Sequence, residues 1–178
     1  MKKLLLLLCF VFIHQVVYPV YFKHLGMSDG LSQVSVMSIY QDCLGRMWFG
    51  TREGVSIYDG ERMRVYKGWE NLDPESSINV LLGHECDHLT GNRQGDIFFR
   101  TCDSLVRYDI REEKFCVVSG CKAKTITSAD GDIWTGYDDM VCRYDEKGDS
   151  LQLYAKTNTP GISSLLISGK KIWIGTYE

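Results

Sequence analysis

One sequence unit recurs along most of this chain and constrains the fold more than any other feature. Each copy has a glycine turn, an apolar pair built on Trp or Phe, and, in the first three copies, a Tyr-Asp dipeptide ten residues after that aromatic. The four aromatics are spaced by 50, 36 and 39 residues, which suits one four-stranded sheet per copy. The repeat residues are Gly45, Trp48, Gly50, Tyr58, Asp59, Gly95, Phe98, Tyr108, Asp109, Gly131, Trp134, Gly136, Tyr144, Asp145, Trp173 and Gly175.

The first copy divides into four strands separated by turn residues. Residues 35–41, 46–51, 55–58 and 63–66 are rich in β-formers, and Asp, Gly and Glu residues lie between them. The constant spacing within copies indicates hairpins of fixed register. The sequence therefore predicts an all-β protein, a β-propeller of four-stranded antiparallel blades. About three and a half blades of an incomplete ring are expected, in units over residues 34–68, 79–118, 122–155 and 162–178.

The aromatic repeat residues are expected to be structural. Adjacent Trp48 and Phe49 break the alternation of a sheet with one wet face, so their strand should be covered on both sides. Neighbouring blades provide that cover in a propeller. We favour packing between blades over a stacking platform for carbohydrate.

The amino terminus predicts export. Lys2 and Lys3 precede an apolar stretch over residues 4–13, as in a secretory signal peptide over residues 1–20 with an approximate boundary. Ten apolar residues are too few to span a bilayer of about 30 Å. Because no clear cleavage site follows, an uncut anchor stays open as the alternative. Residues 21–178 would then form the propeller domain in the periplasm.

Charge argues against contact with nucleic acid. The formal charge of −3 would become −5 on removal of Lys2 and Lys3, and no basic cluster is interleaved with aromatics. We therefore expect no nucleic acid to bind this segment.

The cysteines are too sparse for a disulfide-built fold. Six would follow the signal peptide, at irregular places in the repeat, and we expect them to pack individually. If one pair forms, Cys116 and Cys121 are the candidates by spacing. The six are Cys43, Cys86, Cys102, Cys116, Cys121 and Cys142.

One string resembles a metal site weakly. In a regular strand, His84, Cys86 and His88 would project from one face and could approach zinc. No CxxC or HExxH accompanies them, so we favour an ordinary first strand and expect no metal and no cofactor. No catalytic residue is expected either, since nucleophile elbows, phosphate loops and paired carboxylates are missing from the sequence. The recurring aspartates are interpreted as turn formers: Asp42, Asp59, Asp109, Asp130 and Asp145.

A family resemblance rests on three stretches of the first unit. FKHLGMSDGLSQ (residues 22–33), VMSIYQD (36–42) and GRMWFGTREGVSIYDG (45–60) closely resemble the start of the two-component regulator propeller sensors. The likeness extends over residues 22–178 but weakens where Arg100 replaces the glycine of the second unit and Tyr137 replaces the threonine of the third. These sensors are the extracytoplasmic halves of hybrid histidine kinases of gut Bacteroidetes.

The resemblance implies a role in a larger protein. Such proteins carry two propellers, a β-sandwich, a membrane helix, a kinase core, a receiver and a DNA-binding region. Many sense oligosaccharides released from glycans and induce polysaccharide-utilisation genes. By this likeness the chain is a non-enzymatic sensor fragment. The complete sensor would bind an oligosaccharide, be tethered to the inner membrane downstream, and form a homodimer.

Two other classes of protein stay open at this point. The Gly-x-Ile-Trp pattern is also found in streptogramin lyases, and the Asp-turn-Trp strings resemble sialidase repeats, so a secreted propeller enzyme is the alternative. An adhesion or scaffold propeller is the third. We also expect residues 22–25 to form a strand that pairs with the last blade of a complete ring and is therefore poorly paired in this chain. Poor stability of the chain alone is expected because the edge over residues 171–176 is unpaired.

Overall fold

The computed structural model describes residues 20–67, 84–102, 104–118, 120 and 122–177. The predicted signal peptide lies almost wholly outside these residues, as do the first residues of the second unit. The strands form three four-stranded antiparallel sheets and one two-stranded sheet. A 3-10 turn, η1 (Met27–Asp29), precedes them.

Each sheet is a meander in which strands follow chain order, and we call the sheets blades one to four. Blade one contains β1 (Val36–Gln41), β2 (Met47–Thr51), β3 (Gly54–Tyr58) and β4 (Met63–Tyr66). Blade two contains β5 (Cys86–Gly91), β6 (Ile97–Thr101), β7 (Ser104–Asp109) and β8 (Lys114–Val117). Blade three contains β9 (Thr125–Ala129), β10 (Asp132–Tyr137), β11 (Met140–Asp145) and β12 (Ser150–Lys156). Blade four has β13 (Ile162–Ser168) and β14 (Lys171–Thr176).

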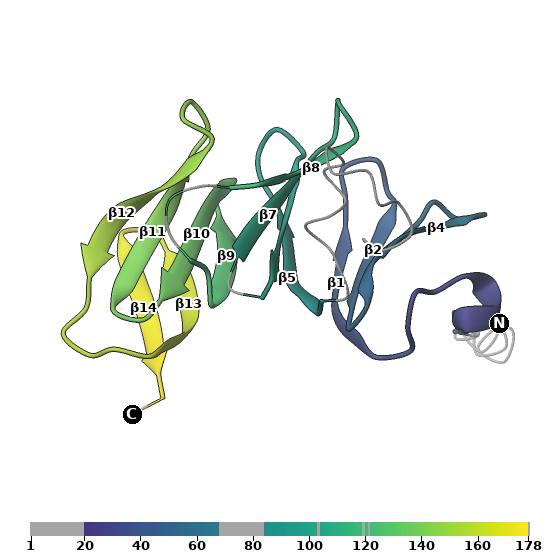
Figure 1. The fold of residues 1–178 in the computed structure, drawn as a ribbon, viewed down its shortest axis with the longest axis horizontal. Helices are drawn as coiled ribbons and strands as arrows, with labels where there is room; N and C mark the ends of the chain where they lie inside the picture. The colour runs from purple at the N-terminus through teal and green to yellow at the C-terminus, as the bar shows by residue number, and fades with distance from the viewer. Residues whose placement is uncertain (1–19, 68–83, 103, 119, 121, 178) are drawn as a thin grey trace, which may run out of the picture.

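The blades stand side by side in chain order (Figure 1). Their first strands form the inner row, since β1 contacts β5, β5 contacts β9 and β9 contacts β13. The turns after β7 and β11 project from the same end of the molecule (Figure 1). This is the predicted propeller architecture, and the described blades do not close a ring.

The ten-residue spacing has the structural meaning expected of it. In every complete blade the Tyr of the third strand lies opposite the residue before the second-strand aromatic. Tyr58 lies opposite Met47, and Tyr108 lies opposite Ile97. The same register places Tyr144 opposite Ile133. The hairpin of the second and third strands is therefore equivalent in all three blades.

Two of the repeat glycines allow blades to approach one another. A Cβ atom on Gly50 would lie 2.4 Å from the backbone oxygen of Cys86, and one on Gly136 would lie 2.6 Å from a methyl carbon of Ile162. No side chain fits at such distances, so glycine is required where the second strand meets the first strand of the next blade. Blade two has Arg100 at this position, and its β6 makes a smaller contact with β9.

The core consists of three apolar layers, one between each pair of neighbouring blades. Trp48 packs with blade two, Phe98 with blade three, and Trp134 with β13 of blade four. This agrees with the packing role predicted for these aromatics. Trp173, by contrast, is largely exposed, because no third strand lies beside β14 within the described residues.

The amino-terminal segment differs from expectation. Residues 22–25 form no strand in the described structure and pair with none of its blades. Lys23 instead contacts the hydroxyl and the ring of Tyr58. The segment is attached further on, where the buried Ser32 donates its backbone N–H to Oγ of Ser56 at 3.0 Å. The expected strand is not formed, but its lack of pairing with the described blades agrees with the expectation that it would be poorly paired in this chain.

Candidate functional site

Blade two departs from the repeat at one pair of positions near the start of its first strand. Asp87 of β5 lies opposite Arg100 of β6. The corresponding pairs in the other blades are small and uncharged: Ser38 opposite Gly50, Thr125 opposite Gly136, and Ser164 opposite Gly175. Blade two therefore has a charged pair in the inner row of strands, at the position where each of the other blades has a glycine opposite a Ser or Thr.

Asp87 is held from two sides. Nε of Arg100 donates to Oδ1 of Asp87 at 2.8 Å, Nη2 donates to Oδ2, and Nη1 donates to the backbone oxygen of Cys102 at 3.0 Å. Nδ1 of His88 lies 2.8 Å from Oδ1 of Asp87. Burial alone would raise the pKa of Asp87, but the hydrogen bonds from His88 and Arg100 hold it below its usual value. The carboxylate is thus ionised, largely buried and fully occupied.

The backbone on both sides of this pair is unusual. His88 has φ 54° and Cys102 has φ 52°, which is the left-handed region, and neither is glycine. The register of β5 and β6 also shifts between Asp87 and Thr90, as in a β-bulge. Such backbone costs about 1–3 kcal/mol per residue and clusters at functional sites, but ordinary turns of this chain also use it, at Glu113, Asp130, Asp138 and Asp149. We define the candidate site as Asp87, His88, Arg100 and Cys102.

The possible zinc ligands of the sequence are not brought together. His84 is exposed and precedes β5, whereas Cys86 is fully buried and donates its thiol weakly to the backbone oxygen of His84 at 3.7 Å. Burial raises the pKa of the Cys86 thiol to about 12, so it is not available as a thiolate. The irregularity after Asp87 breaks the alternation that would align His88 with Cys86. Within the described ranges no three His, Cys, Asp or Glu side chains are grouped to hold a metal ion.

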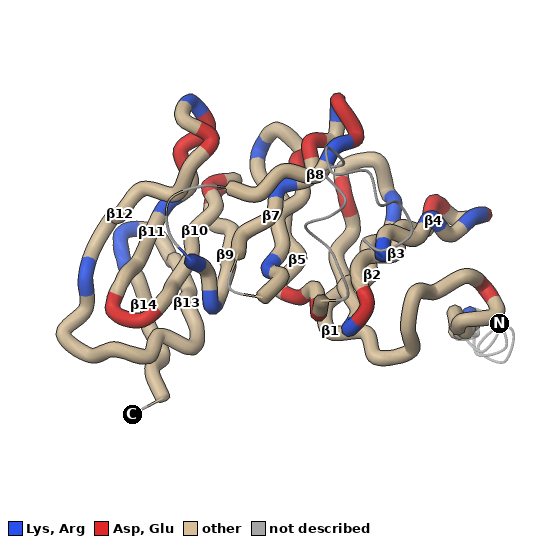
Figure 2. The backbone as a smooth tube through the Cα atoms, in the orientation of Figure 1, with Lys and Arg blue, Asp and Glu red and all other residues tan. Residues whose placement is uncertain are grey.

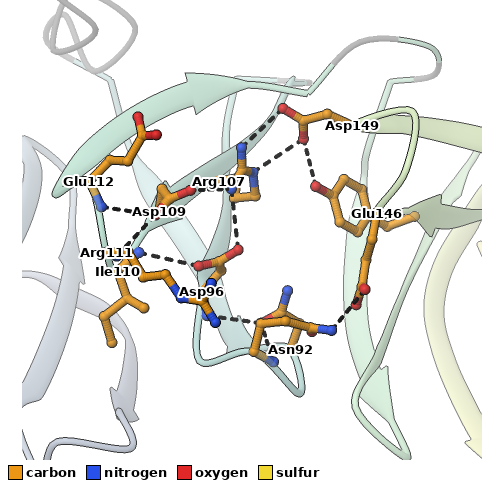
Figure 3. A network of polar contacts seen from close by, with 11 residues as sticks. Asn92, Asp96, Arg107, Asp109, Ile110, Arg111, Glu112, Glu146 and Asp149 are labelled. Carbon is orange, nitrogen blue, oxygen red and sulfur yellow. Dashed lines mark hydrogen bonds and ion pairs between the residues drawn. The ribbon is translucent and has the colours of Figure 1, made fainter.

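A second polar cluster joins blades two and three (Figure 3). Arg107 of β7 donates to both carboxylate oxygens of Asp149, at 3.2 and 3.0 Å, and to Asp96 and Asp109 of its own blade at 3.2 and 2.9 Å. The hydroxyl of Tyr144 donates to Asp149 at 2.6 Å. Burial, and then the hydrogen bond to Asp149, raise the pKa of Tyr144. The cluster is a clamp between blades rather than a reactive centre, because every carboxylate has a partner.

The turn role predicted for the aspartates is confirmed where the structure shows their contacts. Asp42 accepts the backbone N–H groups of Leu44 and Arg46, and Asp59 and Asp109 each accept two from their own turns. Figure 2 shows charges of both signs mixed along the described backbone and concentrated in turns. These carboxylates are used to shape turns.

A groove of about 400 Å³ opens beside the Arg107 cluster. Within its lining, Arg143 pairs with Asp132 at 2.8 Å, and the amide of Gln94 donates to Glu146 at 2.7 Å. Its lining also includes Tyr154, which packs edge-on against Trp134 with ring centroids 4.8 Å apart. Because Gln94 of blade two also lines it, the groove spans a turn of blade two and the last strands of blade three, and only its part around Arg143 and Tyr154 reaches the face towards blade four.

No disulfide joins the cysteines that the structure describes, and Cys116 is a free thiol. Cys121, its candidate partner, lies outside the described residues.

Comparisons with known proteins agree with the architecture. No family model matches the chain. Over 59 residues, 33% of its length, it is 41% identical to Histidine kinase P4 of Formosa agariphila, and it spans 4% of that protein. Two crystal structures of the extracellular domain of the B. thetaiotaomicron protein BT4673 cover 86% of the chain, with TM-scores of 0.68 and 0.67 at 16% and 17% identity. One describes that protein as a one-component system and the other as a hybrid two-component system.

The chain has the same fold as these extracellular domains, which are β-propellers. The fold that the resemblance implies is thus confirmed. The chain spans 21% of each of those extracellular domains, so it corresponds to a small part of them. No helix among the described residues is long and apolar enough to cross a membrane.

Sequence reasoning missed the candidate site, although one signal was visible. Arg100 stands out because it replaces a repeat glycine, but its partner Asp87 could not be assigned without the register of β5 and β6. That register contains an irregularity which no local pattern indicates.

Proposed function

We propose that this chain is the amino-terminal part of the extracytoplasmic sensor region of a hybrid histidine kinase. The observation that carries the proposal is its likeness in fold to extracellular domains of that class, together with the segment 41% identical to a histidine kinase. The segment would perform no chemistry of its own. The parent protein would be a homodimer, anchored in the inner membrane, with this region in the periplasm.

The state of the buried acids supports a sensor over a hydrolytic enzyme. Asp42 and Asp87 accept hydrogen bonds from Arg46 and Arg100, and both have a pKa below the usual value. A general acid needs a raised pKa and a general base needs a free lone pair directed at substrate. These two carboxylates have neither property.

The proposed ligand is an oligosaccharide released from a glycan, and the proposed response is induction of polysaccharide-utilisation genes. A sugar hydroxyl can donate to or accept from an imidazole. The side chain of His88 is partly exposed, and its Nδ1 faces Asp87, so Nε2 is the ring nitrogen that the candidate site would present to a sugar. Binding can change kinase output only by the difference in affinity between two arrangements of the dimer.

Calorimetry of the complete extracytoplasmic region against a panel of glycan oligosaccharides tests the proposal. One oligosaccharide class should bind, and the same class should change autophosphorylation of the full-length protein. The double variant Asp87→Ser with Arg100→Gly recreates the pair of blade one and should weaken binding at least about tenfold. Its control is Arg62→Gln, an exposed arginine in the turn before β4. If no oligosaccharide binds or alters phosphorylation, sugar sensing is wrong; if a sugar is cleaved, the segment belongs to an enzyme.

A further inference from the structure

Two interfaces between blades in this structure use the same aromatic contact. The second-strand aromatic of one blade meets the third-strand Tyr of the next blade edge-on. Trp48 meets Tyr108 at 4.9 Å between ring centroids, and Phe98 meets Tyr144 at 4.9 Å, with interplanar angles of 66° and 64°. The same aromatic contact is therefore repeated at both interfaces between neighbouring blades.

Both interfaces also share an ionic contact. The residue five positions after the third-strand Tyr is acidic, and it reaches an arginine of the preceding blade: Glu113 lies 3.9 Å from Arg64, and Asp149 lies 3.0 Å from Arg107. Both acids have positive φ, 53° and 44°. The turn after the third strand thus presents the Tyr and the acid as one unit, which we call the latch hairpin.

Blade three has a receiving surface for such a hairpin. Trp134 stands where Trp48 and Phe98 stand, but its indole Nε1 is buried without a hydrogen-bond partner among the described residues. Arg143 lies opposite Trp134 as Arg107 lies opposite Phe98, yet its side chain is 48% exposed where that of Arg107 is 15% exposed. Its ion pair is to Asp132 of its own blade.

Tyr154 occupies the place of the missing aromatic. Its ring packs edge-on against Trp134 at 4.8 Å, close to the distance in the other two interfaces, although it comes from β12 of the same blade. The register of β11 and β12 shifts between Val141 and Cys142, so β12 carries an extra residue at this point. Tyr154 is 59% exposed, so little holds it against Trp134 except that contact.

Blade four indicates what covers this surface. Ile162 and Leu165 of β13 already pack against Trp134, as the first strand of a following blade does in the other interfaces. A third strand paired with β14 would stand over Trp134 as β11 stands over Phe98. The occupant therefore belongs to the sheet that β13 and β14 begin.

We propose that Trp134, Arg143 and Tyr154 form a docking surface for a latch hairpin of a fourth blade. This hairpin pairs with β14 and carries a Tyr and, five residues later, an Asp or Glu. On docking, its Tyr replaces Tyr154 against Trp134 and its acid binds Arg143. The groove beside Arg143 is part of this interface, which distinguishes it from the sugar site proposed on blade two.

The test extends the chain with a copy of its own latch hairpin. Thr176, Tyr177 and Glu178 follow Gly175 as Tyr137, Asp138 and Asp139 follow Gly136, so a copy of residues 140–156 joined directly after Glu178 has the natural register. Hydrogen exchange of the β14 amides should slow by at least about tenfold in the extended chain, because the edge becomes paired. Exchange in β1–β4 serves as the internal reference.

Variants of the copy distinguish the latch from simple strand pairing. Asp149→Asn in the copy and Arg143→Gln in blade three should each remove part of the protection, and their effects should not add. Tyr144→Ser in the copy should leave Tyr154 against Trp134. Arg64→Gln is the matched control and should not interact with the copy. Unchanged β14 exchange, or additive effects of the two charge variants, would overturn the proposal. So would a dimer of the unextended chain that protects Trp134, which would assign the surface to a second copy.

Discussion

Trp48 and Trp134 hold the same position in the repeat but are stabilised very differently. Trp48 is fully buried, donates Nε1 to Asp42 at 2.8 Å, and meets Tyr108 of the next blade. Trp134 is 8% exposed, has no partner for Nε1 among the described residues, and meets a Tyr of its own blade. The same repeat position therefore has different contacts in the two blades, because these contacts come from the next blade and from the turn before the strand.

The turns explain the polar half of this difference. In blade one, β1 and β2 are joined by a turn in which Asp42 accepts two backbone N–H groups and also reaches Trp48 and Arg46. Blade two uses Asn92 in the same way for its backbone groups. Blade three joins β9 and β10 through Asp130-Gly131, a shorter hairpin without such a capping side chain. The shorter turn of blade three therefore provides no acceptor for the indole N–H of Trp134.

The largest expected effect comes from truncating the two tryptophans. Trp48→Ala should destabilise its blade by about 3–5 kcal/mol, since it leaves a cavity between two covered sheets. Trp134→Ala should cost at least about 1 kcal/mol less, because it loses no hydrogen bond. Hydrogen exchange of β2 and β3 in one variant, and of β10 and β11 in the other, measures both. Equal losses would show that the next blade contributes little to burial of this position.

A smaller effect is expected from the acceptor of the indole. Asp42→Asn should destabilise blade one by about 3 kcal/mol at neutral pH, because Arg46 is left buried without its counter-charge. Burial alone would raise the pKa of Asp42, but hydrogen bonds from Trp48 and Arg46 lower it below its usual value. Its contribution is therefore complete above the unfolded pKa and is lost as the pH falls through the lower folded pKa. The difference between native and variant chains should be constant from about pH 5 to 7 and shrink below about pH 4. A difference that persists at pH 2 would contradict the assignment of the charge.

These comparisons separate what the sequence could predict from what it could not. The second and third strands were predictable because the spacing from Trp48 to Tyr58 lies within one hairpin, where register is local. The pairing of Asp87 with Arg100 was not, since it depends on an irregularity after Asp87. The same irregularity interrupts the alternation that would have placed His84, Cys86 and His88 on one face.

Contacts between blades were even less accessible to sequence reasoning. Asp149 lies in an ordinary turn of the third unit, and its role depends on Arg107, 42 residues earlier. Nothing in either stretch indicates the other until the blades are placed side by side. The repeat predicts that such interfaces exist, but their ion pairs are set by tertiary structure.

The two arginines provide the next comparison. Arg107→Gln should weaken the contact between blades two and three by about 2 kcal/mol, since three carboxylates lose a largely buried charged donor. Arg143→Gln should change stability by less than about 0.5 kcal/mol in the chain without a latch hairpin, because its ion pair is exposed. Exchange of the β11 and β12 amides reports both variants. A large loss for Arg143→Gln would mean that its pair with Asp132 is itself important.

The smallest expected effect concerns two buried threonines of the second strands. Oγ1 of Thr51 donates to the backbone oxygen of Gly54 at 3.1 Å and lies 2.9 Å from Oγ of Ser32. By contrast, Oγ1 of Thr135 is buried without a hydrogen-bond partner among the described residues. Replacing a bonded hydroxyl by a methyl group loses those bonds, and replacing an unbonded one removes a desolvation penalty. Thr51→Val should therefore destabilise blade one by about 1 kcal/mol, and Thr135→Val should be neutral or stabilise blade three by up to about 1 kcal/mol. Amide exchange in β2 and β10 compares the two. If Thr135→Val is as destabilising as Thr51→Val, the hydroxyl of Thr135 has a partner in solution, and blade three is more completely bonded than its geometry indicates.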